Sequence, residues 1–215
     1  MTSIEFKYDF KAGIHLSGKL WFNHFMLELK LFPNSDNEMD HNIAFERMNY
    51  VINDIVSHSV FVSEDDPTSI LKLVNADIPV LTVPDPGPLD QVLQFVLTAK
   101  LSAVMEETFY IGESKISSEI GNGVTYVYNY DEEDEEEETR TSIVSDSSLK
   151  WWNAAEPRFV TLSTEQEVED FEPNLSWEAM ELEWYGEDVV DVVLDEDTPD
   201  NGSNIMPFKP IKNDS

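Results

Sequence analysis

The sequence predicts an α+β fold, a two-layer domain in which two helices cover one face of a four-stranded antiparallel sheet in the order β-β-α-α-β-β. Two kinds of periodicity support this prediction. Apolar and charged residues alternate near the N-terminus, which is typical of strands with one buried face. Apolar residues then recur every three or four positions in two later segments, which is typical of amphipathic helices.

The strands with the clearest alternation lie at the start of the chain. Phe25, Leu27, Leu29 and Leu31 alternate with polar residues, and residues 6–12 show the same pattern. Ser17 and Gly18 supply residues suited to a tight reversal between these two strands. Two further strands are expected at residues 108–116 and 123–130.

The first helix is expected to begin at His41 or Asn42 and to end at residues 57–59, because its apolar residues form one stripe. The second is expected to begin near Leu89, directly after a proline-rich break. Between them we expect a short apolar run at 60–62, a helical restart at Asp66 or Thr68, and an extended piece at 78–83.

Composition limits the classes of function. The chain has 215 residues with 44 acidic and 13 basic side chains, which gives a formal charge of -31. Without a basic patch, direct binding of nucleic acid through its phosphates is not expected. The absence of cysteine favours a cytoplasmic setting, and no apolar run is long enough to predict a membrane span.

The predicted organisation has four parts. Residues 1–130 form the α+β domain, 131–148 an acidic linker that starts with DEEDEEEE, 149–198 an acidic-aromatic extension, and 199–215 a flexible tail. The extension has two interpretations. It packs on the core or on a second subunit, where residues 151–162 could cover an exposed sheet edge, or it docks on a basic partner.

Several strings in residues 6–130 resemble the tunnelling-fold (T-fold) family, in particular the 6-pyruvoyl- and 6-carboxy-tetrahydropterin synthases. The segments that resemble family motifs, in their order, are YDFKAGIHL, AFERMNYVINDIVSHSVFV, DPGPLDQVLQFVLTAKL and YIGESK. The resemblance implies an oligomer whose sheets join side by side, and a zinc ion held by three histidines.

The strand register decides how much of this zinc site remains. His15 matches the first ligand of the family. If the leucine-rich face of the second strand points to the helices, the other two ligand positions fall on Trp21 and Asn23, and His24 points away. A shift of one residue would make His24 a ligand but would bury the charges of residues 28 and 30, which is costly. We therefore expect a degenerate site with no bound cofactor.

Two more residues match functional positions of the family. The resemblance makes His58 a candidate catalytic residue and Glu113 a candidate for binding the pterin ring. The family's catalytic cysteine has no counterpart in this chain. Isolated histidines often have a structural role, so neither position by itself establishes an enzyme.

Three functions remain open at this point. The first is a zinc-free T-fold protein, for instance from a phage or another virus, that binds a ligand or has a structural role, as a homo-oligomer. The second is an active zinc-dependent synthase of the pterin or 7-deazaguanine pathway that uses His15, His24 and a third ligand, His41 or His58. The third is an acidic inhibitor or DNA mimic that binds a basic protein partner through its acidic C-terminal region.

Overall fold

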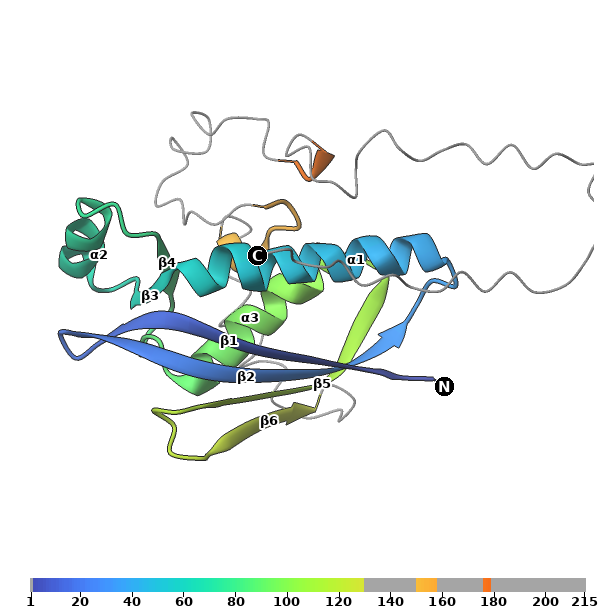
Figure 1. Ribbon diagram of the computed structural model, residues 1–215, viewed down its shortest axis with the longest axis horizontal. Helices are drawn as coiled ribbons and strands as arrows, with labels where there is room; N and C mark the ends of the chain where they lie inside the picture. Colours follow the sequence, from blue (N-terminus) through green and yellow to red (C-terminus); the bar gives the residue numbers. More distant parts are fainter. Residues whose placement is uncertain (1, 130–149, 158–175, 179–215) are drawn as a thin grey trace, which may run out of the picture. The chain divides into compact units, whose positions relative to one another are not determined.

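The computed structural model describes residues 2–129, 150–157 and 176–178 (Figure 1). All of the described residues belong to one compact unit. The predicted linker, 131–148, and the predicted tail, 199–215, therefore lie outside the described residues, as does most of the predicted extension, 149–198. The strands are β1 (Ile4–Leu16), β2 (Lys19–Pro33), β3 (Val60–Ser63), β4 (Val80–Val83), β5 (Phe109–Ser118) and β6 (Thr125–Asn129).

The hairpin of β1 and β2 has the predicted register. Phe10 pairs with Phe25 and Tyr8 with Leu27, and the alternating residues from Phe25 to Leu31 are buried. Ser17 and Gly18 form the turn with φ values of 53° and 75°, a pair of positive angles that matches the right-handed twist of the two strands. One face of the hairpin is therefore buried in the core.

The sheet has six strands in the order β4-β3-β1-β2-β5-β6, so the prediction of a four-stranded antiparallel sheet is wrong in this respect. β3 runs parallel to both β1 and β4, which makes the sheet mixed. β3 has only four residues, and the first three are buried whichever way they point. A strand covered on both faces shows no alternation, so its sequence resembles any short apolar run.

Helices α1 (Glu38–Tyr50) and α3 (Asp90–Met105) lie on the same side of the sheet in Figure 1 and share one core with β1, β2 and β5. α1 begins earlier than predicted because the Asn37 side chain accepts a hydrogen bond from the Met39 N–H, which caps the helix. It continues as a π-helix, η1 (Val51–Ile55), and a 3₁₀ turn, η2 (Val56–His58).

In the described part of the chain, no helix is both long and apolar enough to cross a membrane.

The third α-helix, α2 (Pro67–Val74), joins the parallel strands β3 and β4. Asp66 caps it by accepting a hydrogen bond from the Ser69 N–H, so the predicted restart at this position is confirmed. This bond, together with the Ser69 hydroxyl, holds the pKa of Asp66 below its usual value. Parallel strands need such a crossover connection, which here occupies the 16 residues between β3 and β4.

The described pieces of the extension pack on this core, as one of the two interpretations expected. The Trp151 indole N–H donates to the carbonyl oxygen of Thr82 in the outermost strand β4, at 2.8 Å. Trp151 and Trp152 of η3 (Trp151–Asn153) are buried, and so is Trp177. Trp177 donates to the carbonyl of Ala155. Trp151 and Trp152, from the segment predicted to cover an exposed sheet edge, thus contribute to the core, and Trp151 is bonded to the edge strand β4.

A buried lysine fixes this segment to α3. Lys100 is fully buried, and its ammonium donates to the carbonyl oxygens of Ala154 and Glu156, each at 2.8 Å. Charge-assisted hydrogen bonds are about twice as strong as neutral ones, and a buried ammonium is tolerated only when its donors are satisfied. Lys100 therefore holds a segment that lies more than 50 residues further along the chain.

We expect Lys100→Met to destabilise the protein by about 1–3 kcal/mol, because methionine keeps much of the side-chain volume but leaves the buried Ala154 carbonyl and the Glu156 carbonyl without their donor. Urea unfolding followed by tryptophan fluorescence measures the loss. Lys72→Met, on the exposed surface of α2, is the matched control and should change stability by less than about 0.5 kcal/mol. Equal stability of the two variants would contradict this role of Lys100.

Candidate functional site

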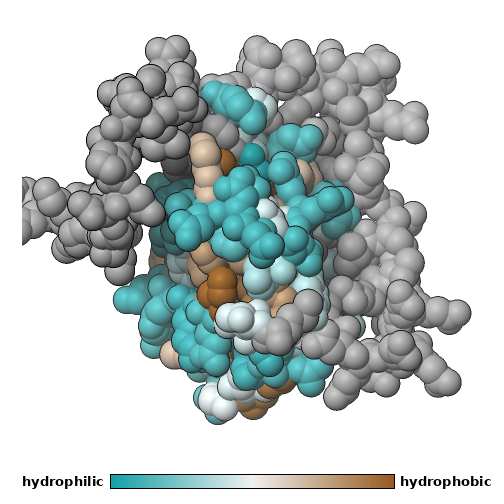
Figure 2. All heavy atoms as spheres, turned by 90° about the vertical axis from the view of Figure 1, so that its right-hand side faces the viewer, coloured by the Kyte–Doolittle hydropathy of each residue, from teal (hydrophilic) through white to brown (hydrophobic). Residues whose placement is uncertain are grey.

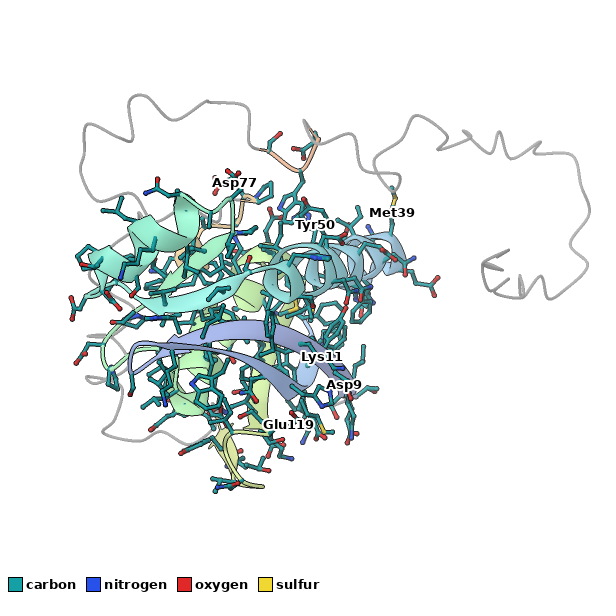
Figure 3. All side chains as sticks on the ribbon, turned by 60° about the vertical axis from the view of Figure 1, so that its left-hand side comes forward. Asp9, Lys11, Met39, Tyr50, Asp77 and Glu119 are labelled. Carbon is teal, nitrogen blue, oxygen red and sulfur yellow. The ribbon has the colours of Figure 1, made fainter. Side chains whose placement is uncertain are left out.

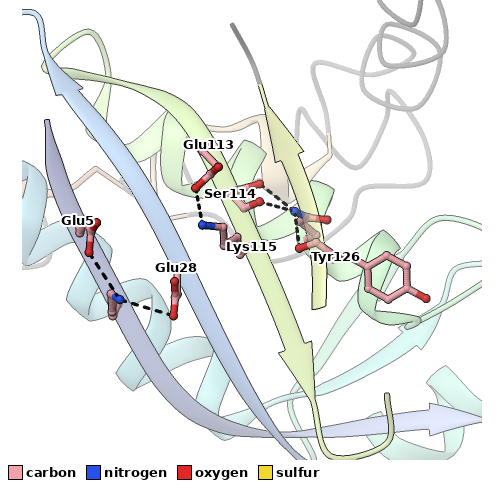
Figure 4. Close-up of polar contacts among 8 residues, drawn as sticks. Glu5, Glu28, Glu113, Ser114, Lys115 and Tyr126 are labelled. Carbon is pink, nitrogen blue, oxygen red and sulfur yellow. Dashed lines mark hydrogen bonds and ion pairs between the residues drawn. The ribbon is translucent and has the colours of Figure 1, made fainter. Parts of the chain in front are cut away.

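The outer face of the sheet, on the side away from α1 and α3, carries a network of charged residues. Lys7 lies 3.6 Å from Glu5 and 3.7 Å from Glu28, and Lys115 lies 2.6 Å from Glu113 (Figure 4). The strands present these residues alternately with the buried ones, so positive and negative charges face each other across neighbouring strands. This face is consequently close to neutral in a strongly acidic protein.

His24 belongs to this outer face. Its register partner on β1 is Lys11, and its Nε2 contacts the carboxylate of Asp9, while Nδ1 lies 3.9 Å from Glu119. Figure 3 shows Asp9, Lys11 and Glu119 on the sheet side of the molecule, away from the labelled side chains of α1. The surroundings of His24 are thus two carboxylates and a lysine at the surface.

His15 lies on the same outer face but at a different level. It is paired with Leu20, four residues along the strand from the pair of Lys11 and His24, which corresponds to about 13 Å. Its Nδ1 lies 3.5 Å from the carboxylate of Asp66, the cap of α2. His15 and His24 therefore have separate acidic partners.

Trp21 and Asn23, at the two positions that the resemblance reserves for zinc ligands, point to the inner side of the sheet. Their register partners are Ile14 and Ala12, both buried. Asn23 is 2% exposed, and its side-chain oxygen accepts a hydrogen bond from the Ile120 N–H at 3.2 Å. Because cross-strand partners share a face, these two residues and His15 lie on opposite sides of the sheet.

The zinc site implied by the resemblance does not fit these residues. One imidazole on the outer face, an amide on the inner face and an indole without a metal-binding lone pair cannot surround one ion. His41 is engaged elsewhere, with Nε2 at 2.7 Å from the Ser35 carbonyl, and His58 ends η2. Among residues 2–129, 150–157 and 176–178, no three His, Cys, Asp or Glu side chains form a group suited to a metal.

Glu113 lies in the charged network and not on the helix side of the sheet. Its carboxylate accepts a hydrogen bond from Lys115, which raises the pKa of the lysine, and its cross-strand neighbours are Lys30 and Asn129. The side chain is 31% exposed. A ligand that used Glu113 to bind two N–H donors would have to displace Lys115 or share the carboxylate with it.

The sequence analysis did not identify a row of polar residues on the face of α3 that contacts the sheet. Gln94 is 2% exposed, and its amide donates to the Ser114 carbonyl at 2.8 Å, the Ser114 hydroxyl at 3.1 Å and the Tyr126 carbonyl at 3.4 Å (Figure 4). One turn earlier, Asp90 accepts a hydrogen bond from Ser118, while partial burial raises the pKa of its carboxyl group. One turn later, Thr98 is also buried. In the sequence, the spacing of four between these polar residues indicates that they share one face of the helix.

Two cavities lie near the other end of α3, on either side of the Glu106–Glu107 turn. The larger has a volume of about 920 Å³ and the smaller about 690 Å³, and both are lined by Asn34, Glu106 and Glu107. The end of the molecule that carries the start of α1 is seen in Figure 2, where apolar residues are visible between hydrophilic ones. Cavities of this size are in the range of small-molecule sites.

Comparisons with known proteins give a distant match in structure alone. No family model and no curated protein matches the chain. The matching solved structures include two catalytic-residue mutants of Plasmodium vivax 6-pyruvoyltetrahydropterin synthase, each at 10% sequence identity and a TM-score of 0.38. Each alignment covers 60% of this chain and 98% of the synthase. The chain is an α+β protein with a mixed six-stranded sheet.

We expect Gln94→Met to destabilise the protein by about 1–3 kcal/mol, because the substitution removes the amide that links α3 to β5 and β6 while keeping a side chain of similar size. Gln91→Met is the matched control, since Gln91 is exposed on the same helix. Chemical unfolding of both variants measures the difference. If the two variants lost equal stability, the hydrogen bonds of Gln94 would not hold the sheet against α3.

Proposed function

We propose that this protein is a zinc-free relative of the T-fold synthases that works as an acidic binding protein, with a basic protein as its partner. The observation that carries the proposal is the uneven distribution of charge along the chain. Of 44 acidic residues, 24 lie in 130–149, 158–175 and 179–215, which contain only four of the 13 basic residues. Such a block of like charge attracts a basic surface and raises the rate of encounter.

The way the chain is attached to the domain supports this proposal. The acidic run of 131–138 follows directly after β6, the last strand of the sheet. The chain rejoins the domain at Lys150, which forms an ion pair with Glu64 and is followed by the buried Trp151. The described residues on both sides of 130–149 thus belong to one folded body, to which the eight consecutive carboxylates are covalently linked.

The positions of the histidines support a role without zinc. If the protein were a zinc-dependent synthase, the zinc ion at His15 would need two further ligands on the same face of the sheet. Asn23 and the exposed Trp21 lie on the inner face of the sheet, and His24 has Asp9 and Glu119 as its neighbours. The second function considered for the sequence, a zinc-dependent synthase, therefore has no favourable arrangement of side chains to support it.

We expect the protein purified without chelators from zinc-supplemented cells to contain far less than one zinc ion per chain. Atomic emission spectroscopy measures the metal, and a known zinc protein purified in parallel is the control for metal loss. One zinc per chain in the wild type, lost in both His15→Ala and His24→Ala, would contradict the proposal and favour the synthase.

We expect a lysine-rich peptide to bind the protein with an affinity that falls steeply with salt, because the contacts are made between charges in water. Replacing the eight acidic residues of 131–138 by Asn and Gln should weaken binding at low salt and reduce the salt dependence. Fluorescence anisotropy of a labelled peptide, measured across a salt series, provides both quantities.

The matched control exchanges Asp and Glu within 131–138, which keeps every charge and changes only side-chain length. It should bind the peptide as the wild type does. Binding that is insensitive to salt, or equal in the neutralised and wild-type proteins, would show that the acidic run is not the binding element.

A further inference from the structure

The larger cavity beside α3 combines aromatic walls with an acidic rim. Phe95 and Tyr110 line it, and each ring is held by another one, with Phe95 5.3 Å from Tyr128 and Tyr110 4.9 Å from Phe32 between ring centroids. Glu106 and Glu107 supply its charge, and no Lys, Arg or His is among the described residues that line it. The cavity is thus suited to a group that is apolar on one side and positively charged on the other.

A buried hydroxyl in the wall provides an independent sign of a ligand. Thr98 is 2% exposed and lines this cavity, and its hydroxyl oxygen has no hydrogen-bond partner in the described structure. A buried hydroxyl without a partner is costly, and such groups are uncommon in folded proteins. A ligand that donates or accepts a hydrogen bond here would satisfy it.

The backbone at the rim is strained at Glu106, the first of the two glutamates. Glu106 has a φ of 52° and a ψ of -131°, a conformation that favours glycine. Its carboxylate lies 3.1 Å from Nη1 of Arg47, a residue that lines the smaller cavity. Strained backbone persists where the surroundings hold it in place, and it is concentrated at binding sites. With Glu106 turned to Arg47, Glu107 is the carboxylate left to neutralise a ligand in the larger cavity.

We propose that the larger cavity binds a small organic ammonium with an aromatic or branched apolar body. The ammonium lies at the rim near Glu107, the apolar body lies against Phe95 and Tyr110, and Thr98 hydrogen-bonds to a polar atom of the ligand. None of the described residues that line this cavity belongs to 131–138, so its ligand is proposed independently of the basic partner above.

The test is an NMR titration of the full chain with phenethylamine, phenethyl alcohol and phenylacetate, which share a ring and differ in charge. Phenethylamine should produce saturable shifts at Thr98, Ser102 and Glu107, and should bind at least about tenfold more tightly than the alcohol or the anion. Nonspecific attraction to the acidic chain would instead give shifts that rise without saturation.

Variants separate the contributions of single groups. Glu107→Gln should weaken phenethylamine binding. Thr98→Val should weaken, by about fivefold, the binding of tyramine, whose phenol hydroxyl supplies the second polar atom that phenethylamine lacks. Thr98→Ser should restore affinity, and Glu119→Gln, on the outer face of the sheet, should leave it unchanged. The protein with 131–138 neutralised should still bind phenethylamine, which distinguishes this site from the proposed partner-binding run. Absence of saturable shifts, equal binding of the alcohol, or no effect of Thr98→Val would overturn the proposal.

Discussion

The burial of one face of the β1–β2 hairpin by α1 and α3 is the constraint on which the rest of the structure depends. Side chains alternate strictly along a strand, so placing Phe25 and Leu27 in the core also places His24 and Glu28 on the opposite face. The same alternation turns Asn23 inward. The alternation of side chains along β1 and β2 therefore produces a polar outer face with paired charges. It also separates the residues that a metal site would have to bring together.

The sequence could predict this hairpin and its covering helices because their patterns are long and regular. It predicted an apolar run at 60–62 and an extended piece at 78–83, but not that they join the sheet as β3 and β4. Each has four residues and pairs in parallel, without a hairpin turn that the sequence could reveal. Their buried residues are covered by neighbours on both faces of the sheet, so the sequence shows no alternation of apolar and polar residues there. The start of α1 was misplaced by a few residues for a related reason, because the cap at Asn37 lies inside a polar stretch with several suitable residues.

The candidate site residues were harder to predict than the fold. Glu113 and His58 were singled out by resemblance, while the residues that the structure buries with specific polar contacts, Gln94 and Lys100, look unremarkable in an amphipathic helix. Whether a polar side chain on a helix is buried depends on what packs against it. For Lys100 that partner is a segment more than 50 residues away, which no helical period can reveal.

The charge distribution and the fold fit together physically. A net charge of -31 would oppose a compact state if it were spread evenly over the folded domain. The outer sheet face avoids this by pairing lysines with glutamates across β1, β2 and β5, and most of the acidic surplus lies outside the described residues. The domain can then be stabilised mainly by apolar burial, which salt does not screen, while the interactions of the acidic run are strongly screened. Folding and the proposed binding of a basic partner should consequently respond to ionic strength in different ways, because they depend on different forces.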